Sequence, residues 1–349
     1  MTKAAELAKM GEVLTNSQIG GRRNIIINGA MEVAQRGTSA SSKTASDYYT
    51  CDRWRTEASG ATFNTSQQSN SASDMATTGA KHFLRMEVTT ANNNSGISQK
   101  IEAKNIRQFK GEKLTLSFYA KGTNPNGGSF DVVRQFDDGS TTSTQEKSSL
   151  TVTSSFVKYT YTFDYPDEGS VTMTDANAKM ALSFLQPNGD TSTNAWTLDI
   201  TSVQLEVGSK ATPFEHRSFG EELSLCQRYC VQIVNTHSAG TGHIILAGMS
   251  RGSTNKNFTL PLPVTMRNTT PSVTLTGDVR LLNPEAHDYV NATDTLTCGG
   301  VTPTLVYSGN MLVLLYTGSV TGVTDTGNAD YNFQIVSASD HLFIIDSEL

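Results

Sequence analysis

The feature that most constrains this fold is an alternation of apolar and polar residues with a period of two, which recurs from residue 24 to about residue 205. It is clearest in three stretches, residues 114–119, 158–163 and 180–184. This period is typical of β-strands with one buried face. Polar turn segments at residues 124–128 and 137–139 separate such stretches, and the second suits a tight hairpin because glycine accepts positive φ. Strands broken this regularly by polar turns predict a two-sheet β-sandwich.

The last strand of this series changes phase within itself. Residues 196–200 place their apolar side chains in one phase, whereas residues 203–205 place them in the other. A slip of one residue moves every following side chain to the opposite face of a strand. We therefore expect a β-bulge near residues 201–202.

A second series of short strand-like stretches fills residues 231–349 and predicts a second, small β domain. Within it, residues 312–316 are apolar on both strand faces, which requires burial on both sides, either within the domain or between subunits. Between the two domains, Ser218 and Glu221 form a capping-box signature. This signature predicts a linker helix over residues 218–230.

Residues 1–23 predict a short amphipathic helix and a hinge. Leu7, Met10 and Leu14 follow a heptad-like spacing, with charged residues on the other faces. A helix of this length is marginal alone in water, so copies of itself or another protein must hold it. A frayed tail is the alternative. The predicted domains are thus residues 1–23, 24–217, 218–230 and 231–349.

Composition excludes several classes of partner. The 349 residues are long enough for two core-forming domains, and a net charge of −6 offers no electrostatic footprint for nucleic acid. No apolar run approaches the length that spans a bilayer, and the N-terminus lacks the order of a signal peptide, so we expect neither membrane insertion nor signal-directed export. Four widely spread cysteines, Cys51, Cys226, Cys230 and Cys298, lack zinc-site spacing and are expected to be free thiols, as in a reducing cytoplasm.

Several ordered motifs bracket the first domain. The opening is NIIINGAMEVAQRG at residues 24–37, followed by Tyr49 and DRW at residues 52–54. The closing is QLEVG at residues 204–208 and ATPFEHR at residues 211–217. Further matches are FGEEL at residues 219–223, CQRY at residues 226–229 and the final DSEL. In this order and spacing the chain resembles a family of tailed-bacteriophage virion proteins.

The resemblance implies a mainly β protein, in which a jelly-roll β-sandwich is followed by the second small β domain. It also implies a location in the virion after assembly in the host cytoplasm, as a tail fibre or spike subunit, with other phage tail or capsid proteins as partners. The N-terminal helix, with Leu7, Met10 and Leu14, would then attach the subunit to the virion. Because viral fibres commonly use threefold symmetry, we expect a homotrimer.

A host-surface polysaccharide is the expected ligand of such a subunit. Sugar sites on sandwich folds set aromatic faces against sugar C–H surfaces, with amides and carboxylates on the hydroxyls. Tyr119, Tyr161 and Trp196 are candidates if they lie on an exposed sheet face. The alternative for each is an aromatic ring that fills the core.

No cofactor is expected, with one candidate exception. The segment at residues 28–32 also resembles the opening of jelly-roll carbohydrate-binding modules, which often hold a structural calcium. Calcium prefers hard oxygen ligands, and Glu32 with Asp199 would supply two.

Enzyme activity is not expected. No histidine lies in a metal-binding motif of the HExxH kind. The acidic residues 131, 137 and 138 are close in sequence, but an acidic pair in a polar hairpin is usually a solvated turn. Two readings remain beside the glycan-binding fibre: an architectural capsid or tail subunit, and a small polysaccharide-cleaving enzyme.

Overall fold

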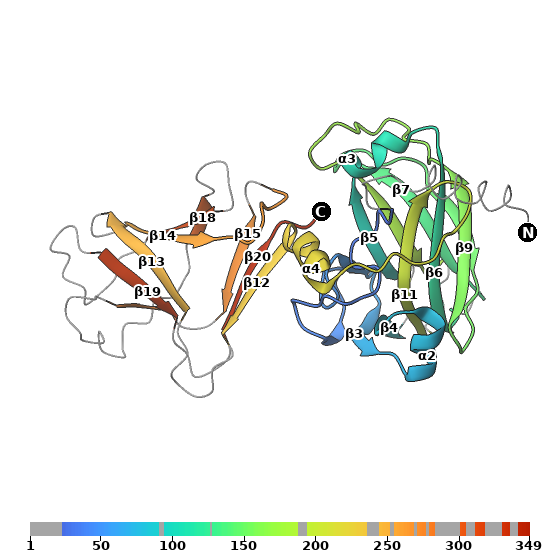
Figure 1. The fold of residues 1–349 in the computed structure, drawn as a ribbon, viewed down its shortest axis with the longest axis horizontal. Coiled ribbons are helices and arrows are strands. Elements are labelled where there is room, and N and C mark those ends of the chain that lie inside the picture. Colours follow the sequence, from blue (N-terminus) through green and yellow to red (C-terminus); the bar gives the residue numbers. More distant parts are fainter. Residues whose placement is uncertain are drawn as a thin grey trace, which may run out of the picture. The chain divides into compact units, whose positions relative to one another are not determined.

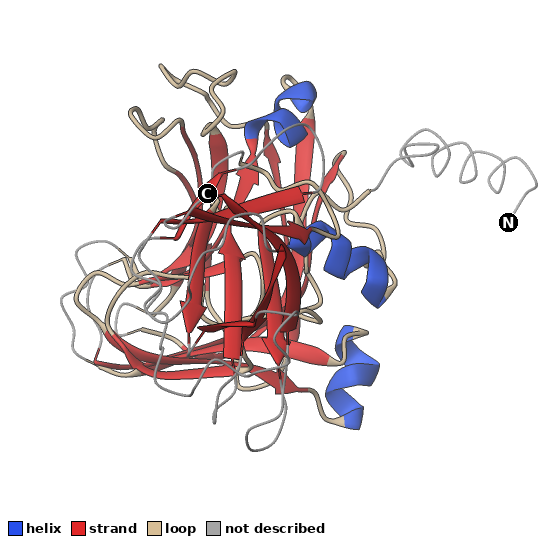
Figure 2. Cartoon of the chain, turned by 90° about the vertical axis from the view of Figure 1, so that its left-hand side faces the viewer, coloured by secondary structure: helices blue, strands red, loops and turns tan. Residues whose placement is uncertain are grey.

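The computed structural model comprises two compact units. The units are residues 1–223 with Leu349, and residues 224–348. The described residues are 23–90, 94–125, 128–187, 194–235, 244–251, 255–268, 271–276, 279–282, 301–304, 311–317, 330–335 and 341–349. Figures 1 and 2 show that strands dominate the described chain, as the alternation predicts. Among the described helices, none is long and apolar enough to cross a membrane.

The first unit is built from two antiparallel sheets. One has the strand order β1-β3-β4-β11-β6-β9 and the other β2-β5-β10-β7-β8. The strands of the first sheet are β1 (Ser39–Lys43), β3 (Thr62–Ser69), β4 (His82–Thr90), β11 (Trp196–Val207), β6 (Lys113–Thr123) and β9 (Val157–Asp164). Those of the second are β2 (Trp54–Glu57), β5 (Gly96–Glu102), β10 (Lys179–Leu185), β7 (Phe130–Asp137) and β8 (Glu146–Leu150). The short helices are α2 (Ala72–Thr78), α3 (Ala103–Ile106) and η1 (Arg107–Phe109).

The order of these strands is that of a jelly roll. From β4 to β11 every connection crosses to the other sheet except the one between β7 and β8. This places β4-β11-β6-β9 in one sheet and β5-β10-β7-β8 in the other, which is the double Greek key of a jelly roll. The expected jelly-roll sandwich is therefore confirmed by its topology.

The core lies between the two sheets, where alternate residues of each strand meet. The ring of Phe118 on β6 packs edge-on against Phe184 on β10, with centroids 4.8 Å apart. Phe130 on β7 packs in the same way against Trp196 on β11 at 5.0 Å. These contacts join inner faces of opposite sheets, and edge-to-face aromatic pairs contribute beyond the area that they bury.

The predicted β-bulge is present in β11. The pairing of β11 with β6 shifts register between Thr201 and Gln204, and Ser202 has a φ of 51°. The bulge lets the main chain leave the sheet ladder locally, so that Val203 instead donates its N–H to the carbonyl of Gly29 at 2.9 Å. The bulge thus makes room for the opening motif.

The predicted turn at residues 137–139 also forms, at the end of β7. Asp138 donates its N–H to the Thr141 carbonyl at 3.1 Å, and Gly139 has a φ of 91°. Positive φ at this position costs glycine little, which is why the sequence ends the strand there.

The second unit also contains antiparallel sheets. One has three strands, β12 (Cys230–Asn235), β20 (His341–Asp346) and β15 (Ser272–Thr276), with β20 in the middle. The other has the order β16-β19-β13-β14-β18-β17. Its strands are β16 (Val279–Leu282), β19 (Asp330–Ile335), β13 (Ile244–Arg251), β14 (Asn255–Pro261), β18 (Met311–Thr317) and β17 (Val301–Thr304). The apolar run at residues 312–316 lies in β18, which pairs with β14 on one side and β17 on the other. The burial of its side chains lies outside the described part of the structure.

The helix α4 (Phe219–Gln227) forms where the capping box predicts it, although it ends before residue 230. The Ser218 hydroxyl accepts the N–H of Glu221 at 3.3 Å. Cys230 therefore begins a strand rather than continuing the helix, which corrects the helical placement of that cysteine. Cys51, Cys226 and Cys230 are buried and are not disulfide-bonded. Cys298 and the predicted N-terminal helix with Leu7, Met10 and Leu14 lie outside the described residues.

Candidate functional site

The opening motif is held against the last strand of the sandwich. Asn24 donates its side-chain amide to the Val203 carbonyl at 3.0 Å and accepts the Leu205 N–H at 3.1 Å. Ile25 donates its backbone N–H to the Leu205 carbonyl at 2.9 Å. Asn24 therefore takes the place of a strand partner for β11, which explains why an amide with both donor and acceptor stands first in the motif.

The closing motif returns to the same place. Gln204 accepts the backbone N–H of Glu215 at 2.8 Å, and Glu206 accepts the N–H and the hydroxyl of Thr212 at 2.9 and 2.6 Å. The Glu215 carboxylate in turn accepts the backbone N–H of Asn24 at 2.8 Å. The two ends of the domain, about 190 residues apart, are thus joined directly.

Arg217 completes this connection. Its guanidinium is almost fully buried and donates to the Ile26 carbonyl at 3.0 Å and to the Asn24 carbonyl. It also pairs with Glu222 of α4 at 3.3 Å, and Glu222 accepts the Asn28 N–H at 2.5 Å. Charge-assisted hydrogen bonds of this kind are the stronger ones. We call the interlocked residues the motif clasp: Asn24, Gln204, Glu206, Glu215, Arg217 and Glu222.

The remaining motif residues are also structural. Asn28 donates its side-chain amide to the carbonyls of Val33 and Asp52 at 2.8 and 2.9 Å. Its own carbonyl accepts the indole N–H of Trp54 at 2.9 Å. The motifs that carry the family resemblance therefore build and close the sandwich.

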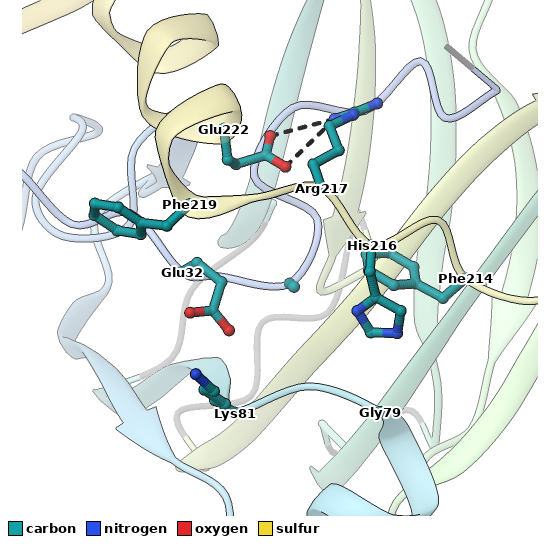
Figure 3. A pocket seen from close by; sticks show the side chains of 9 residues that line it. Glu32, Gly79, Lys81, Phe214, His216, Arg217, Phe219 and Glu222 are labelled. Carbon is teal, nitrogen blue, oxygen red and sulfur yellow. Dashed lines mark hydrogen bonds and ion pairs between the residues drawn. The ribbon is translucent and has the colours of Figure 1, made fainter.

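A pocket of about 220 Å³ opens beside the clasp (Figure 3). Four separate segments line it: the opening motif, the turn between α2 and β4, the closing motif and the first turn of α4. We call it the motif pocket, and its lining residues are Ala30, Glu32, Gly79, Lys81, Phe214, His216, Arg217, Phe219 and Glu222. Because Arg217 and Glu222 belong to the clasp, one wall of the pocket is fixed before any ligand arrives.

The pocket combines polar groups with aromatic surface. Figure 3 shows the Glu32 carboxylate and the Lys81 amine turned toward each other, with His216 beside Phe214. Glu32 lies 3.4 Å from Nδ1 of His82. Phe219 is 58% exposed, so its ring is accessible to a ligand. The arrangement offers an acceptor, an amine donor and apolar faces within one small space.

The three aromatic residues that the sequence nominates for sugar binding do not come together in one site. Trp196 is 1% exposed, and its indole N–H donates to Gln186 at 2.9 Å, so this nomination is wrong: the ring fills the core. Tyr119 is half-buried and lies on β6, opposite Lys158. Tyr161 is half-buried on β9 and donates its hydroxyl to the Ser149 carbonyl at 2.8 Å.

The two residues nominated for calcium have different partners. Asp199 is buried and accepts two N–H groups of Arg85 at 2.8 and 2.7 Å, and these bonds raise the pKa of the Arg85 guanidinium. Glu32 instead faces His82. Within the described ranges, no cluster of three or more His, Cys, Asp or Glu side chains is placed to hold a metal. A calcium ion on Glu32 and Asp199 stays a prediction of the sequence.

The acidic turn has a structural use for its carboxylates. Asp137 accepts the Gly139 N–H at 2.5 Å, and Asp138 accepts the N–H groups of Ser140 and Thr141 at 2.9 and 2.7 Å.

Burial raises the pKa of the Cys51 thiol, which keeps this side chain protonated and unreactive.

Sequence reasoning misses most of the motif pocket. Lys81 and Gly79 follow a helix that the alternation does not reveal, and the capping box predicts the helix that begins at Phe219 but no pocket beside it. Glu32 was nominated, but for calcium rather than for a pocket. The signal that the sequence does carry is that most lining residues belong to ordered motifs at the two ends of the domain, which the fold brings together.

Comparisons with known proteins give no assignment of family. No family model and no curated protein matches this chain. Among solved structures, it is similar to a putative sugar binding protein from Bacteroides thetaiotaomicron, with 12% identity over 53% of this chain and 100% of that one and a TM-score of 0.32.

Two other solved structures are named for the polysaccharides that they bind. The CBM22-1 xylan-binding domain from Paenibacillus barcinonensis Xyn10C shares 15% identity over 52% of this chain and 99% of that one, with a TM-score of 0.29. The N-terminal cellulose-binding domain from Cellulomonas fimi β-1,4-glucanase C shares 20% over 37% and 80%, with a TM-score of 0.24. At these TM-scores the jelly-roll assignment rests on the strand order of this chain alone.

Proposed function

We propose that this chain is a structural subunit of a tailed-bacteriophage virion whose jelly-roll unit binds a glycan on the host surface. The ordered motifs, which resemble those of tailed-bacteriophage virion proteins, support the virion part of the proposal. The clasp shows that these motifs act together to close one domain. Opening and closing motifs contact each other across about 190 residues, so each requires the other to be present. The motifs therefore form one connected structural unit, and their occurrence together is not a set of independent coincidences.

The motif pocket is the observation that carries the glycan part. A sugar ring has an apolar C–H face and a rim of hydroxyls that both donate and accept. The pocket offers the exposed ring of Phe219 for the first, and the Glu32 carboxylate and Lys81 amine for the second. Its volume of about 220 Å³ suits one sugar unit rather than a longer segment.

Binding of single sugars tests this assignment. Saturation-transfer NMR with N-acetylglucosamine, galactose and methyl glucoside should show contact with at least one of them. Phe219→Ala should abolish the signal with little loss of stability, because the ring is mostly exposed. Met75→Ala is the matched control, since Met75 is also exposed, at 40%, but lies on α2 outside the pocket. Equal binding by all three proteins would refute the pocket as a sugar site.

An architectural subunit without a ligand is the second candidate, and the clasp itself favours it. Every clasp residue is used to close the fold, as a purely structural protein would require. A glycan array with the intact protein separates the two, because a scaffold binds no glycan above background. We propose no catalytic activity, and release of reducing sugar from host envelope would overturn that.

The virion location is tested on the particle. Antibody labelling of intact virions should find the protein at the tail. We also propose that residues 1–23 attach it through Leu7, Met10 and Leu14. Virions assembled with Leu7→Asp and Leu14→Asp should lack the protein, since a charge on the apolar face removes the docking surface. Normal incorporation would show that attachment lies elsewhere.

A further inference from the structure

The strand β9 forms one edge of the six-stranded sheet and carries a row of aromatic rings. Tyr159, Tyr161 and Phe163 alternate along the strand, and Tyr165 follows directly after it. All four are half-buried and pack against the core of the first unit. Alternate residues of a strand point to one face, so the rings form a single row, which we call the β9 ladder.

The rings of the two central tyrosines have a defined orientation. Phe118 on the neighbouring strand β6 stacks with Tyr159 at 5.6 Å and 24°, and with Tyr161 at 6.1 Å and 21°. Phe118 is fully buried and therefore covers the inward face of both rings. Because β9 is the outermost strand of this sheet among the described residues, the exposure that each tyrosine retains lies on the side away from Phe118.

The tips of these rings are fixed as well. Tyr159 donates its hydroxyl to the Thr151 carbonyl at 2.7 Å, and Tyr161 donates to the Ser149 carbonyl at 2.8 Å. Burial raises the pKa of both hydroxyls, so they keep the protons that these bonds need. Each ring is thus held at both its base and its tip, which presents a rigid surface and lowers the entropic cost of binding.

The ladder is also electrically balanced. Near one end Lys113 pairs with Asp164 at 2.7 Å, and Lys110 pairs with Glu168 at 2.5 Å. Glu168 also accepts the hydroxyl of Tyr165 at 3.0 Å. At the interior side Arg134 lies over the ring of Phe163 at 4.5 Å. These pairs place both signs of charge next to the ladder, which favours an uncharged ligand over an acidic or basic one.

The dimensions suit an extended chain. A strand rises about 3.4 Å per residue, so neighbouring rings are about 7 Å apart and the row from Tyr159 to Tyr165 is about 20 Å long. The backbone groups on the free side of an edge strand are unpaired and can meet hydroxyls. A single small molecule would use only one of these rings.

We propose that the β9 ladder is a second carbohydrate-binding surface, which takes an extended, uncharged polysaccharide chain along the edge of the sandwich. The inference rests on the proposed function for the class of ligand, but it is independent of the motif pocket. The pocket holds one unit, whereas the ladder holds a run of units. A partner protein that adds a strand to β9 is the competing occupant.

The experiment measures retardation in native gels that contain dextran, glucomannan or xylan. Wild-type protein should be retarded by at least one polymer, and short oligosaccharides of the same type should compete more strongly as they lengthen. Tyr161→Leu and Tyr159→Leu keep apolar bulk but remove the flat face, and together they should weaken binding roughly tenfold, which corresponds to about 1.4 kcal/mol. Tyr161→Phe keeps the face and should bind within about twofold of wild type.

The controls separate this inference from the proposed function. Met75→Ala, at an exposed position of α2 that belongs neither to the ladder nor to the pocket, should leave retardation by polymer unchanged. Two results would overturn the ladder as a binding surface. One is loss of polymer binding only in Phe219→Ala, and the other is polymer binding that persists in the leucine variants while their melting is normal. In either case the proposal that the protein binds a glycan would still hold. If neither polymers nor single sugars bind, both proposals fall. Cross-linking of a protein strand at Thr160 in place of polymer binding would also overturn the ladder.

Discussion

At the scale of single residues, Gly29 shows how tightly the opening motif fits. A Cβ atom at this position would lie 2.2 Å from the main-chain oxygen of Val203, which is fixed by the bulge and by Asn24. Backbone atoms cannot move aside as a flexible side chain does. We expect Gly29→Ala to lower the free energy of unfolding by about 3 kcal/mol, the upper range for overpacking.

The matched control is Gly220→Ala, because nothing lies within 4 Å of a Cβ built there and the residue is in α4. Alanine in place of a helical glycine should leave stability equal or raise it by about 0.5 to 1 kcal/mol. Chemical denaturation of both variants checks the pair. Similar losses in both would mean that Gly29 is not packed as described.

Asp138 gives the turn after β7 a dependence on pH. Backbone N–H groups, first that of Thr172 at 2.8 Å, lower the pKa of this carboxyl from its ordinary 3.8. An acid with a lowered folded-state pKa stabilises the fold above its unfolded pKa, and this contribution is lost as pH falls through the folded value. Asp138→Asn should therefore melt lower than wild type at pH 7, and the gap should shrink below about pH 3.8.

Asp164→Asn is the control, because its carboxylate is 83% exposed and exposed ion pairs contribute little. Its melting temperature should follow that of wild type across the same range. A gap for Asp138→Asn that stays constant from pH 7 to pH 2 would contradict the linkage.

At the scale of elements, α4 depends on its cap. The Ser218 hydroxyl accepts the Glu221 N–H, and removal of such a cap costs about 1 kcal/mol. Ser218→Ala should lose this amount, whereas Ser224→Ala, at an exposed position of the same helix, should be neutral or slightly stabilising. The melting temperatures of the two variants test this expectation. Equal effects would mean that the Ser218 cap does not stabilise α4.

Phe214 belongs to the same junction but is only half-buried, packed edge-on against His216 with centroids 5.0 Å apart. A fully buried phenylalanine would cost about 3 kcal/mol or more when truncated. Because the ring is only half-buried, we expect Phe214→Ala to lower the free energy of unfolding by about half of that amount, which is still a larger loss than for Ser218→Ala. Thermal unfolding of the two variants side by side gives the order, and a larger loss in Ser218→Ala would reverse it.

At the scale of the whole molecule, we expect a homotrimer. The motivation is the predicted N-terminal helix, too short to stand alone, together with the doubly apolar run that forms β18. Light scattering of the full-length chain at micromolar concentration should give the mass of three copies. Deletion of residues 231–349 should leave a folded sandwich of lower association, because the first unit has its own core. A monomeric full-length protein would refute this.

Features of the fold that depend on local chemistry can be predicted from the sequence. The period of two specified strands, the phase change in β11 specified its bulge, and Ser218 and Gly139 specified a helix start and a turn. Each signal acts within a few residues of its effect. The resemblance of the ordered motifs predicts the jelly roll, and the observed connections between the two sheets agree with that prediction.

Only the tertiary structure decided which residues meet. Trp196 and Tyr161 share the same alternating pattern, yet one ring is enclosed between the sheets and the other stands at an edge, because β11 is central and β9 is outermost. Position within a sheet is set by long-range pairing, which no local period encodes. For the same reason the pocket was invisible in the sequence: Glu32, Lys81 and Phe219 become neighbours only when the clasp joins the two ends of the domain.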